Sequence, residues 1–163
     1  MKIVKALALV ATLIGAQNAF AVTTQTSQFQ VSLTLQAACT ITSSALNFGT
    51  QGVLTSAINQ STSLSVTCTN AAPYSIGLDA GNVTGSAVSS RLLQAGAGGP
   101  TVAFQLYKDS SRSQIWGNTV GVDAATGVGN GSAQTLSVYG QIAPQSTPAA
   151  GTYSSTITAT ISF

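Results

Sequence analysis

Runs in which apolar and polar residues alternate recur along most of this chain, and no segment repeats its apolar residues with the period of a helix. Such alternation places every second side chain on one face, as in a β-strand with one buried side. Turn-rich segments such as 95–100 and 121–131 separate the runs, which is typical of an antiparallel β-sandwich. The sequence therefore predicts an all-β domain, without an internal repeat or a domain boundary.

The predicted strands, with the residues expected to point inward, are 63–69 (Leu64, Val66, Cys68), 74–78 (Tyr74, Ile76, Leu78), 102–107 (Val102, Phe104, Leu106), 136–142 (Leu136, Val138, Ile142) and 153–163 (Ile157, Ala159, Ile161, Phe163).

The first 21 residues have the pattern of a secretory signal peptide. Two lysines precede an apolar run at 6–15, and Ala19-Phe20-Ala21 is a small-x-small cleavage site. A membrane-spanning helix needs about 20 apolar residues, so this run is too short to be an anchor. We expect residues 1–21 to be removed on export, and the mature chain to begin at Val22 without inserting into a membrane.

The charge balance of the mature chain excludes one class of partners. Once the two lysines of the signal are removed, three cations face three carboxylates: Arg91, Lys108 and Arg112 against Asp79, Asp109 and Asp123. A near-neutral protein has no electrostatic footprint for nucleic acid or anionic lipid. It also has little self-repulsion to oppose association with other copies.

Cys39 and Cys68 are the only cysteines of the chain. An even number of cysteines in an exported protein favours a disulfide. A metal pair would need more ligands, and a redox dithiol would need a CxxC spacing. We therefore expect one disulfide between Cys39 and Cys68.

The stretch QFQVSLTLQ (28–36) is an alternating run near the start of the expected mature chain, with Phe29, Val31, Leu33 and Leu35 on one face. Two interpretations are open. The run could form the first strand of its own sandwich, because consecutive strands commonly pair within a chain. It could instead complete the sheet of another molecule.

The run at 153–163 ends the sequence without a turn that could bring a further strand back. A strand that is apolar on its inner face needs a neighbour on both sides. Without one it leaves unpaired backbone groups and an open hydrophobic groove. We expect the sandwich to lack a closing strand beside this run.

Several short motifs, each weak alone, occur in an order that resembles the spore coat protein U-like family, which includes pilins of archaic, Csu-type chaperone-usher systems. The motifs are LNFGT (46–50), VTCTN (66–70), PYSIGLDAG (73–81), LYKD (106–109), Trp116-Gly117, Tyr139-Gly140 and AGTY (150–153).

The resemblance implies an incomplete immunoglobulin-like sandwich that lacks its last strand and is completed by donor-strand exchange. A periplasmic chaperone would lend a strand during export. At the outer-membrane usher, the N-terminal segment of a neighbouring subunit would replace that strand. The expected organisation is a signal peptide (1–21), a donor segment (22–36) and a pilin domain (37–163).

The alternation and the resemblance together assign candidate site residues. The donor side chains are Phe29, Val31, Leu33 and Leu35, and the acceptor groove is expected to be lined by Ile157, Ala159, Ile161 and Phe163.

Catalysis is not expected. The chain has no histidine and no glutamate, which excludes a Ser-His-Asp triad, a Cys-His pair and a histidine metal cage. The three aspartates are the only carboxylates left for acid/base chemistry, and the two at strand ends, Asp79 and Asp109, precede turns, where Asp usually satisfies backbone groups. We expect no cofactor and no metal.

The leading functional hypothesis is a structural subunit of a secreted pilus that reaches the cell surface and supports adhesion and biofilm formation. The partners would be neighbouring subunits, the chaperone and the usher. The alternatives are a surface or spore coat protein that forms no pilus, and a single-domain surface adhesin.

Overall fold

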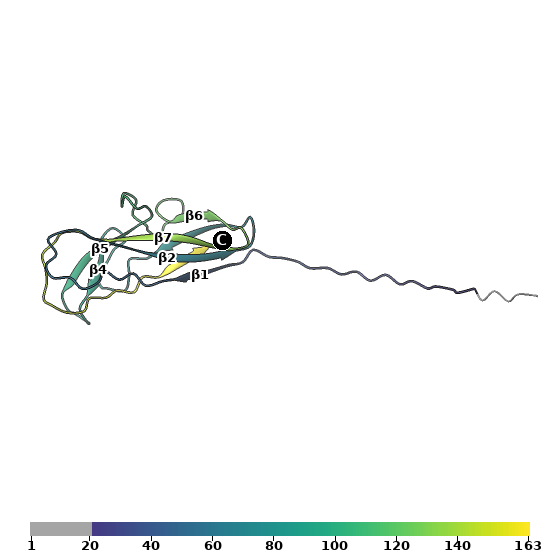
Figure 1. Ribbon diagram of the computed structural model, residues 1–163, viewed down its shortest axis with the longest axis horizontal. Coiled ribbons are helices and arrows are strands. Elements are labelled where there is room, and N and C mark those ends of the chain that lie inside the picture. The colour runs from purple at the N-terminus through teal and green to yellow at the C-terminus, as the bar shows by residue number, and fades with distance from the viewer. Residues whose placement is uncertain (1–20) are drawn as a thin grey trace, which may run out of the picture. The chain divides into compact units, whose positions relative to one another are not determined.

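The computed structural model describes residues 21–163. The signal peptide expected at 1–21 therefore lies outside the described residues, apart from Ala21. The chain has two parts, which divide after Thr34. In the first part, residues 21–34 form no strand and all their side chains are exposed (Figure 1).

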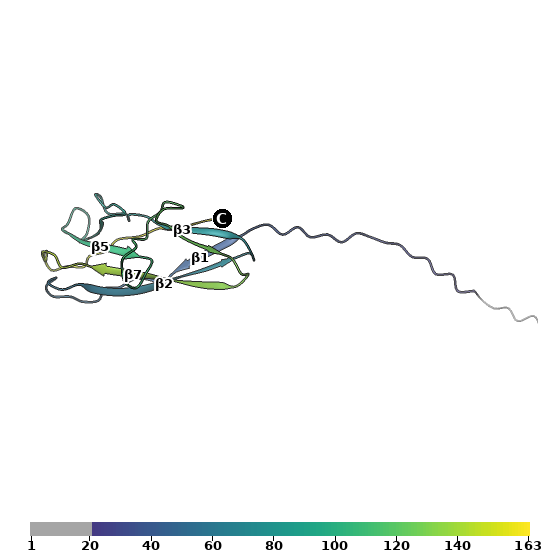
Figure 2. The same ribbon diagram turned by 90° about the horizontal axis from the view of Figure 1, so that it is seen from above.

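The second part, Leu35–Phe163, folds into two antiparallel sheets and, like the rest of the described chain, contains no helix. One sheet has five strands in the order β1-β2-β7-β5-β4, and the other has three in the order β6-β3-β8. Figure 2 shows β3 in a different layer from β2 and β7. The predicted all-β sandwich is confirmed. The strands are β1 (Cys39–Ser43), β2 (Ile58–Cys68), β3 (Pro73–Leu78), β4 (Arg91–Gln94), β5 (Thr101–Tyr107), β6 (Ala125–Val128), β7 (Ala133–Ile142) and β8 (Ala159–Ser162).

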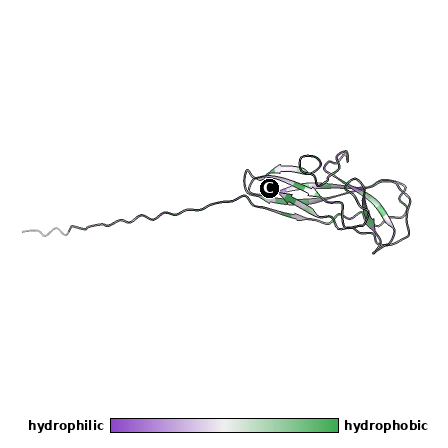
Figure 3. Cartoon of the chain, turned by 180° about the vertical axis from the view of Figure 1, so that it is seen from behind, coloured by the Kyte–Doolittle hydropathy of each residue, from purple (hydrophilic) through white to green (hydrophobic). Residues whose placement is uncertain are grey.

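The inner faces of the two sheets form one apolar core. Side chains that alternate along β2, β5 and β7 point into it, and apolar and polar residues alternate along the strands in Figure 3. The inward-facing residues predicted for these strands and for β3 are confirmed, with Leu136 only half-buried. The buried core consists of Leu54, Leu64, Val66, Cys68, Ala72, Tyr74, Ile76, Leu78, Val102, Phe104, Leu106, Trp116, Val138 and Ile142.

The structure differs from the predicted strands in several places. It contains two further strands that were not predicted, β1 and β4. The segment 121–131, expected to be a turn-rich linker, contains the short strand β6, which pairs with β3. The run expected to be one strand over 153–163 forms a regular ladder only in β8. The reason is that residues 154–158 bond to Gln94 and to the turn 79–82 rather than to one continuous neighbouring strand.

Candidate functional site

A groove of about 1270 Å³ opens between the two sheets. Its floor is apolar and comes from both layers, with Leu64, Leu78, Leu93, Val102, Phe104, Leu106, Val138 and Ile142 contributing. Two segments without regular strand pairing form its walls, one following β1 and the other preceding β8. Small-molecule sites have volumes of about 300–1,000 Å³, so this groove is larger than most of them.

The first wall is the segment 153–159, which is hydrogen-bonded along one edge only. Ser154 exchanges backbone hydrogen bonds with Gln94, at 3.0 and 3.1 Å. The backbone N–H of Thr156 donates to Asn82 Oδ1 (2.8 Å), and that of Thr158 donates to Asp79 Oδ1 (2.9 Å). In return, the backbone N–H of Asn82 donates to the carbonyl of Thr156 (3.2 Å) and that of Asp79 to the carbonyl of Thr158 (3.1 Å). The backbone and side chains of Asp79 and Asn82 thus take the place of a neighbouring strand and continue the edge that β8 shares with β3.

The opposite edge of this wall is free. Because the even-numbered residues direct their backbone groups toward β3, β4 and the 79–82 turn, the odd-numbered ones direct theirs to the other side. β8 is the last strand on that side of its sheet. From Tyr153 to Ile161 the odd-numbered side chains are half-buried and the even-numbered ones exposed. A strand arriving here would find unpaired backbone groups along nine residues.

Gly81 allows the first wall to lie close to the turn that holds it. A Cβ atom at this position would lie 2.6 Å from Ser155 Oγ and 2.9 Å from the Ile157 Cδ1 atom. The φ of Gly81 is +91°, in the region that favours glycine.

The second wall follows β1. It carries Leu46 and Phe48, which pack against the core beside Gly140 of β7. The ring of Phe48 meets that of Phe104 edge-on, with centroids 6.2 Å apart. Gly140 of β7 makes room for this wall. A Cβ atom there would lie 2.5 Å from Leu46 Cδ2 and 3.0 Å from Phe48 Cζ.

Hydrogen bonds close the groove at the end remote from β8. The backbone N–H of Leu54 donates to Thr147 Oγ1 (2.8 Å), and the N–H of Gln145 donates to the carbonyl of Leu54 (2.9 Å). Residues 147–152, which connect this end to Tyr153, also line the groove there. The two walls are therefore tied together there and separate along the rest of the groove.

A buried cation supports the turn that holds the first wall. Arg91 is fully buried, and its guanidinium donates to the carbonyls of Leu78 (2.9 Å), Asp79 (2.8 Å) and Trp116 (2.7 Å). Desolvation by burial lowers the pKa of Arg91 to about 10, although Asp79 and Asp123 act against the shift. Arg91 thus fixes the backbone of the residue whose carboxylate holds Thr158.

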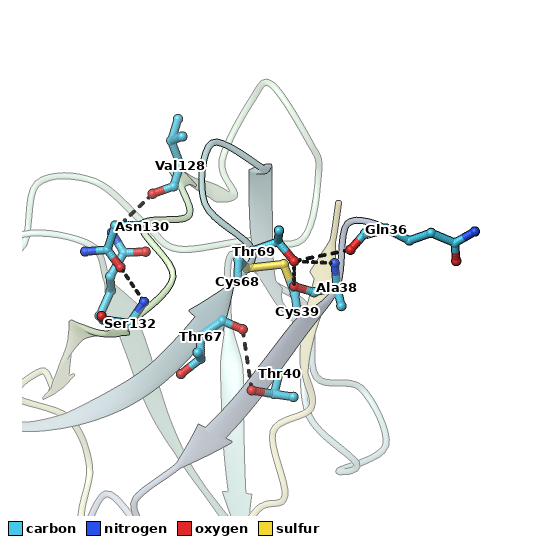
Figure 4. The surroundings of a disulfide bond; sticks show 11 residues. Gln36, Ala38, Cys39, Thr40, Thr67, Cys68, Thr69, Val128, Asn130 and Ser132 are labelled. Atoms are coloured by element: carbon cyan, nitrogen blue, oxygen red, sulfur yellow. Dashed lines mark hydrogen bonds between the residues drawn. A yellow bond between two sulfur atoms is a disulfide. The ribbon is translucent and has the colours of Figure 1, made fainter. Parts of the chain in front are cut away.

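A clasp made by Cys39, Cys68 and Thr69 fixes the chain where it enters the domain (Figure 4). Cys39 and Cys68 form the expected disulfide between β1 and β2. The Thr69 hydroxyl accepts from the N–H of Ala38 (3.0 Å), and two carbonyls lie within reach of its single proton, those of Ala38 (3.3 Å) and Gln36 (3.4 Å). The N–H of Thr69 donates to the carbonyl of Ala38 (2.9 Å). Residues 36–39 are therefore held on the end of β2.

The predicted donor side chains belong to neither sheet. Phe29, Val31, Leu33 and Leu35 are 79–87% exposed. These four side chains alternate with polar ones and form an apolar face that is exposed in the described chain. Residues 28–36 form no strand in the described chain.

The predicted acceptor residues lie at different places. Ile157 and Ala159 line the groove, whereas Ile161 is half-buried against the core beyond it. Phe163 follows the end of β8 and is 59% exposed. Sequence reasoning missed the second wall and the far end, including Leu46, Phe48, Leu54 and Tyr153. The alternation of Leu46 and Phe48 within LNFGT was the available signal.

The described residues offer little for other chemistry. They contain no cluster of three or more residues that could ligate a metal. Within the same range, no helix has the length and hydropathy needed to cross a membrane.

The sequence of this chain matches a known family of proteins. The Spore Coat Protein U domain matches residues 25–160. The chain is 33% identical over 154 residues to "Protein U" of Myxococcus xanthus, covering 86% of each protein.

A solved structure has a similar fold. It is a chain of the CsuC–CsuE chaperone-tip adhesion subunit pre-assembly complex from archaic chaperone-usher Csu pili of Acinetobacter baumannii, with 19% identity and a TM-score of 0.58. The match covers 80% of this chain and 41% of that one, so this chain corresponds to less than half of it. The domain match and the curated relative together show that the chain belongs to the Spore Coat Protein U domain family.

Proposed function

We propose that this protein is a structural subunit of a secreted surface pilus, assembled by the chaperone-usher pathway through donor-strand exchange. The observation that carries the proposal is the groove, with its apolar floor and its free edge from Tyr153 to Ile161. The segment 28–36 supplies the complementary element, an exposed alternating run. In β-strand addition, main-chain hydrogen bonds provide affinity and alternate side chains fill pockets.

The site residues follow from this proposal. Phe29, Val31, Leu33 and Leu35 of one subunit would fill the groove of the next. Ile157, Ala159, Ile161 and Phe163 are proposed to contact the donor, the first two from within the groove and the last two from its β8 end. Burying four such side chains contributes roughly 6–12 kcal/mol in total.

The conformational entropy lost by the donor is of similar size, at about 1–2 kcal/mol per residue. Exchange is therefore favourable only onto a groove that is already formed. The disulfide, the Arg91 network and the Asp79 and Asn82 contacts support such a groove before any donor arrives.

The proposed organisation and route follow from the same argument. Residues 1–21 are the export signal, 22–36 the donor segment and 37–163 the pilin domain. The chain passes through the periplasm with a chaperone, reaches an outer-membrane usher and joins neighbouring subunits at the cell surface. The similarity to a chaperone–subunit complex supports the chaperone as a partner. Adhesion and biofilm formation would be properties of the assembled polymer, and the subunit would not be an enzyme.

The family description is also compatible with a second candidate, a coat protein that covers a cell or spore without forming a pilus. Both candidates use the same groove and donor. Electron microscopy of the assembled material distinguishes a fibre from a coat, and chaperone and usher genes beside this one would favour the pilus.

Peptide exchange tests the proposed function. The protein would be co-purified with its chaperone from the periplasm and mixed with a peptide of residues 27–36. We expect the peptide to displace the chaperone and raise the Tm of the subunit. A matched peptide with threonine at positions 29, 31, 33 and 35 should do neither. Equal behaviour of the two peptides would exclude an apolar donor site.

A further inference from the structure

The clasp and the free edge meet at the same end of the sandwich. Cys39 pairs with Cys68 in β2, which leads through a short turn into β3. In β3, Ser75 pairs with Ser162, close to the end of β8. β1 and β8 also approach each other directly. The chain therefore enters the domain beside the place where the free edge ends.

This position limits how a chain's own donor segment could enter its own groove. The free edge from Tyr153 to Ile161 spans eight residue steps, or about 26 Å. A donor that runs antiparallel to this edge would place Leu35 toward the Tyr153 end. The chain would then have to turn and return along the groove before reaching the clasp.

The linker is too short for that return. Only Gln36 and Ala37 lie between Leu35 and Ala38, so the connection spans at most about 11 Å. Moreover, Ala38 is itself held by Thr69, whose hydroxyl accepts from its N–H and whose N–H donates to its carbonyl. A segment folding back from the clasp can run only parallel to the edge, with Phe29 toward Tyr153.

We propose that the clasp of Cys39, Cys68 and Thr69 makes the groove selective for the donor segment of another copy of this chain. This inference rests on the proposed function. The donor of a second copy has no tether to this clasp, so it can run antiparallel to 153–161. Antiparallel pairing is also slightly more stable per residue than parallel pairing.

Selection of this kind is needed because a tethered donor has a large statistical advantage. A segment on a short flexible linker has an effective concentration on the order of 1 mM, which exceeds a protein concentration of ~10 µM about 100-fold. Without a constraint on direction, each groove would be filled by its own donor. Because the clasp prevents a chain's own donor from pairing antiparallel to 153–161, the tethered donor has no concentration advantage in that arrangement.

Cysteine cross-linking of the full mature chain tests the proposal. In antiparallel pairing Gln28 lies near Thr160, and in parallel pairing near Thr152. A chain carrying Gln28→Cys and Thr160→Cys should form disulfide-linked multimers on a non-reducing gel. The matched chain with Gln28→Cys and Thr152→Cys should not cross-link, either between copies or within one chain. A disulfide that closes within one chain of either variant would overturn the proposal.

An insertion tests the tether itself. Ten Gly and Ser residues between Gln36 and Ala37 add about 33 Å of reach. We expect the lengthened Gln28→Cys/Thr160→Cys chain to form its disulfide within one molecule. The amount of disulfide-linked multimer at ~10 µM protein should then fall by about 100-fold, the ratio of the two effective concentrations. The same insert after Val22 should leave multimers unchanged. Equal multimer formation by the two insertions would contradict the proposal.

These outcomes also separate the inference from the proposed function. If the 27–36 peptide exchanges normally but the unmodified linker allows closure within one chain, only the selectivity fails. If neither the peptide nor a second copy enters the groove, the proposed function fails and the inference with it.

Discussion

At the scale of single residues, Arg91 shows why a charge is worth burying in this sandwich. Its donors satisfy carbonyls on β3, on the turn after it and at Trp116, together with the Gln105 side chain. These acceptors come from different segments that meet at the base of the first wall. No apolar residue could hold them, because buried carbonyls without donors are costly.

Replacing this cation tests its role. We expect Arg91→Met to lower the free energy of unfolding by at least about 3 kcal/mol, since several buried acceptors lose their donors. Lys108→Met, at a partly exposed position, should cost less than about 1 kcal/mol. Urea denaturation of both variants measures the difference. If the two variants lose similar amounts of unfolding free energy, the hydrogen bonds of Arg91 contribute no more to stability than the side chain of Lys108.

Asp109 makes a pH-dependent contribution to stability. The Ser111 hydroxyl, and then the backbone N–H groups of Ser113 and Gln114, hold the pKa of its carboxyl well below the usual range. Because the folded pKa is depressed, the stabilisation is present above the unfolded pKa of about 3.9 and is lost as the pH falls below it. Asp109→Asn should therefore be less stable than the unmodified protein at pH 7, and the gap should narrow below about pH 4. Urea midpoints across this range measure the gap, and a pH-independent gap would contradict the assignment.

At the scale of secondary-structure elements, the side chains of Asp79 and Asn82 bind backbone N–H groups of the first wall that no neighbouring strand pairs. We expect the double variant Asp79→Ala/Asn82→Ala to release residues 154–158 and to slow uptake of the 27–36 peptide at least tenfold, the effect of about 1.4 kcal/mol. Asn130→Ala removes a similar Asn contact, to the N–H of Ser132, outside the groove, and should leave uptake unchanged. Fluorescence of a labelled peptide gives both rates. Unchanged uptake in the double variant would mean that the wall forms without these contacts.

The second wall depends on the missing side chain of Gly140. A larger residue there would push the ends of Leu46 and Phe48 toward the groove, since the atoms that it would meet belong to these two side chains and not to the backbone. We expect Gly140→Val to weaken peptide binding by at least tenfold while the domain remains folded by circular dichroism. Ser137→Val, at an exposed position of β7 outside the groove, is the control. Normal binding by Gly140→Val would exclude a narrowed groove.

Sequence alternation predicted β2, β3, β5, β7 and the run that ends in β8, but it missed β1, β4 and β6. β4 was missed because a buried arginine interrupts its apolar pattern, and β6 because its four residues lie among turn-forming ones. The alternation of Leu46 and Phe48 was the only signal for the second wall, and it is too short to predict a strand. The first wall was therefore visible in the sequence as alternation at 153–159, whereas the position of the second wall emerges only from tertiary contacts.

At the scale of the whole molecule, the disulfide closes a loop of 29 positions. The chain-entropy model gives it roughly 3–4 kcal/mol of stabilisation. We expect Cys39→Ala/Cys68→Ala to lose about this amount in urea denaturation, and reduction of the unmodified protein to lose the same. A much smaller loss in both experiments would show that the clasp is held mainly by Thr69.

The clasp also determines how a polymer of such subunits would bear load. A pull on the donor segment enters each domain at Cys39, at the edge of the five-stranded sheet, where β1 alone could be peeled away one hydrogen bond at a time. The covalent bond to Cys68 passes the force straight to β2, which is paired on both sides. Mechanical failure would then have to begin elsewhere, with withdrawal of the donor from the groove rather than unravelling of the domain that carries it.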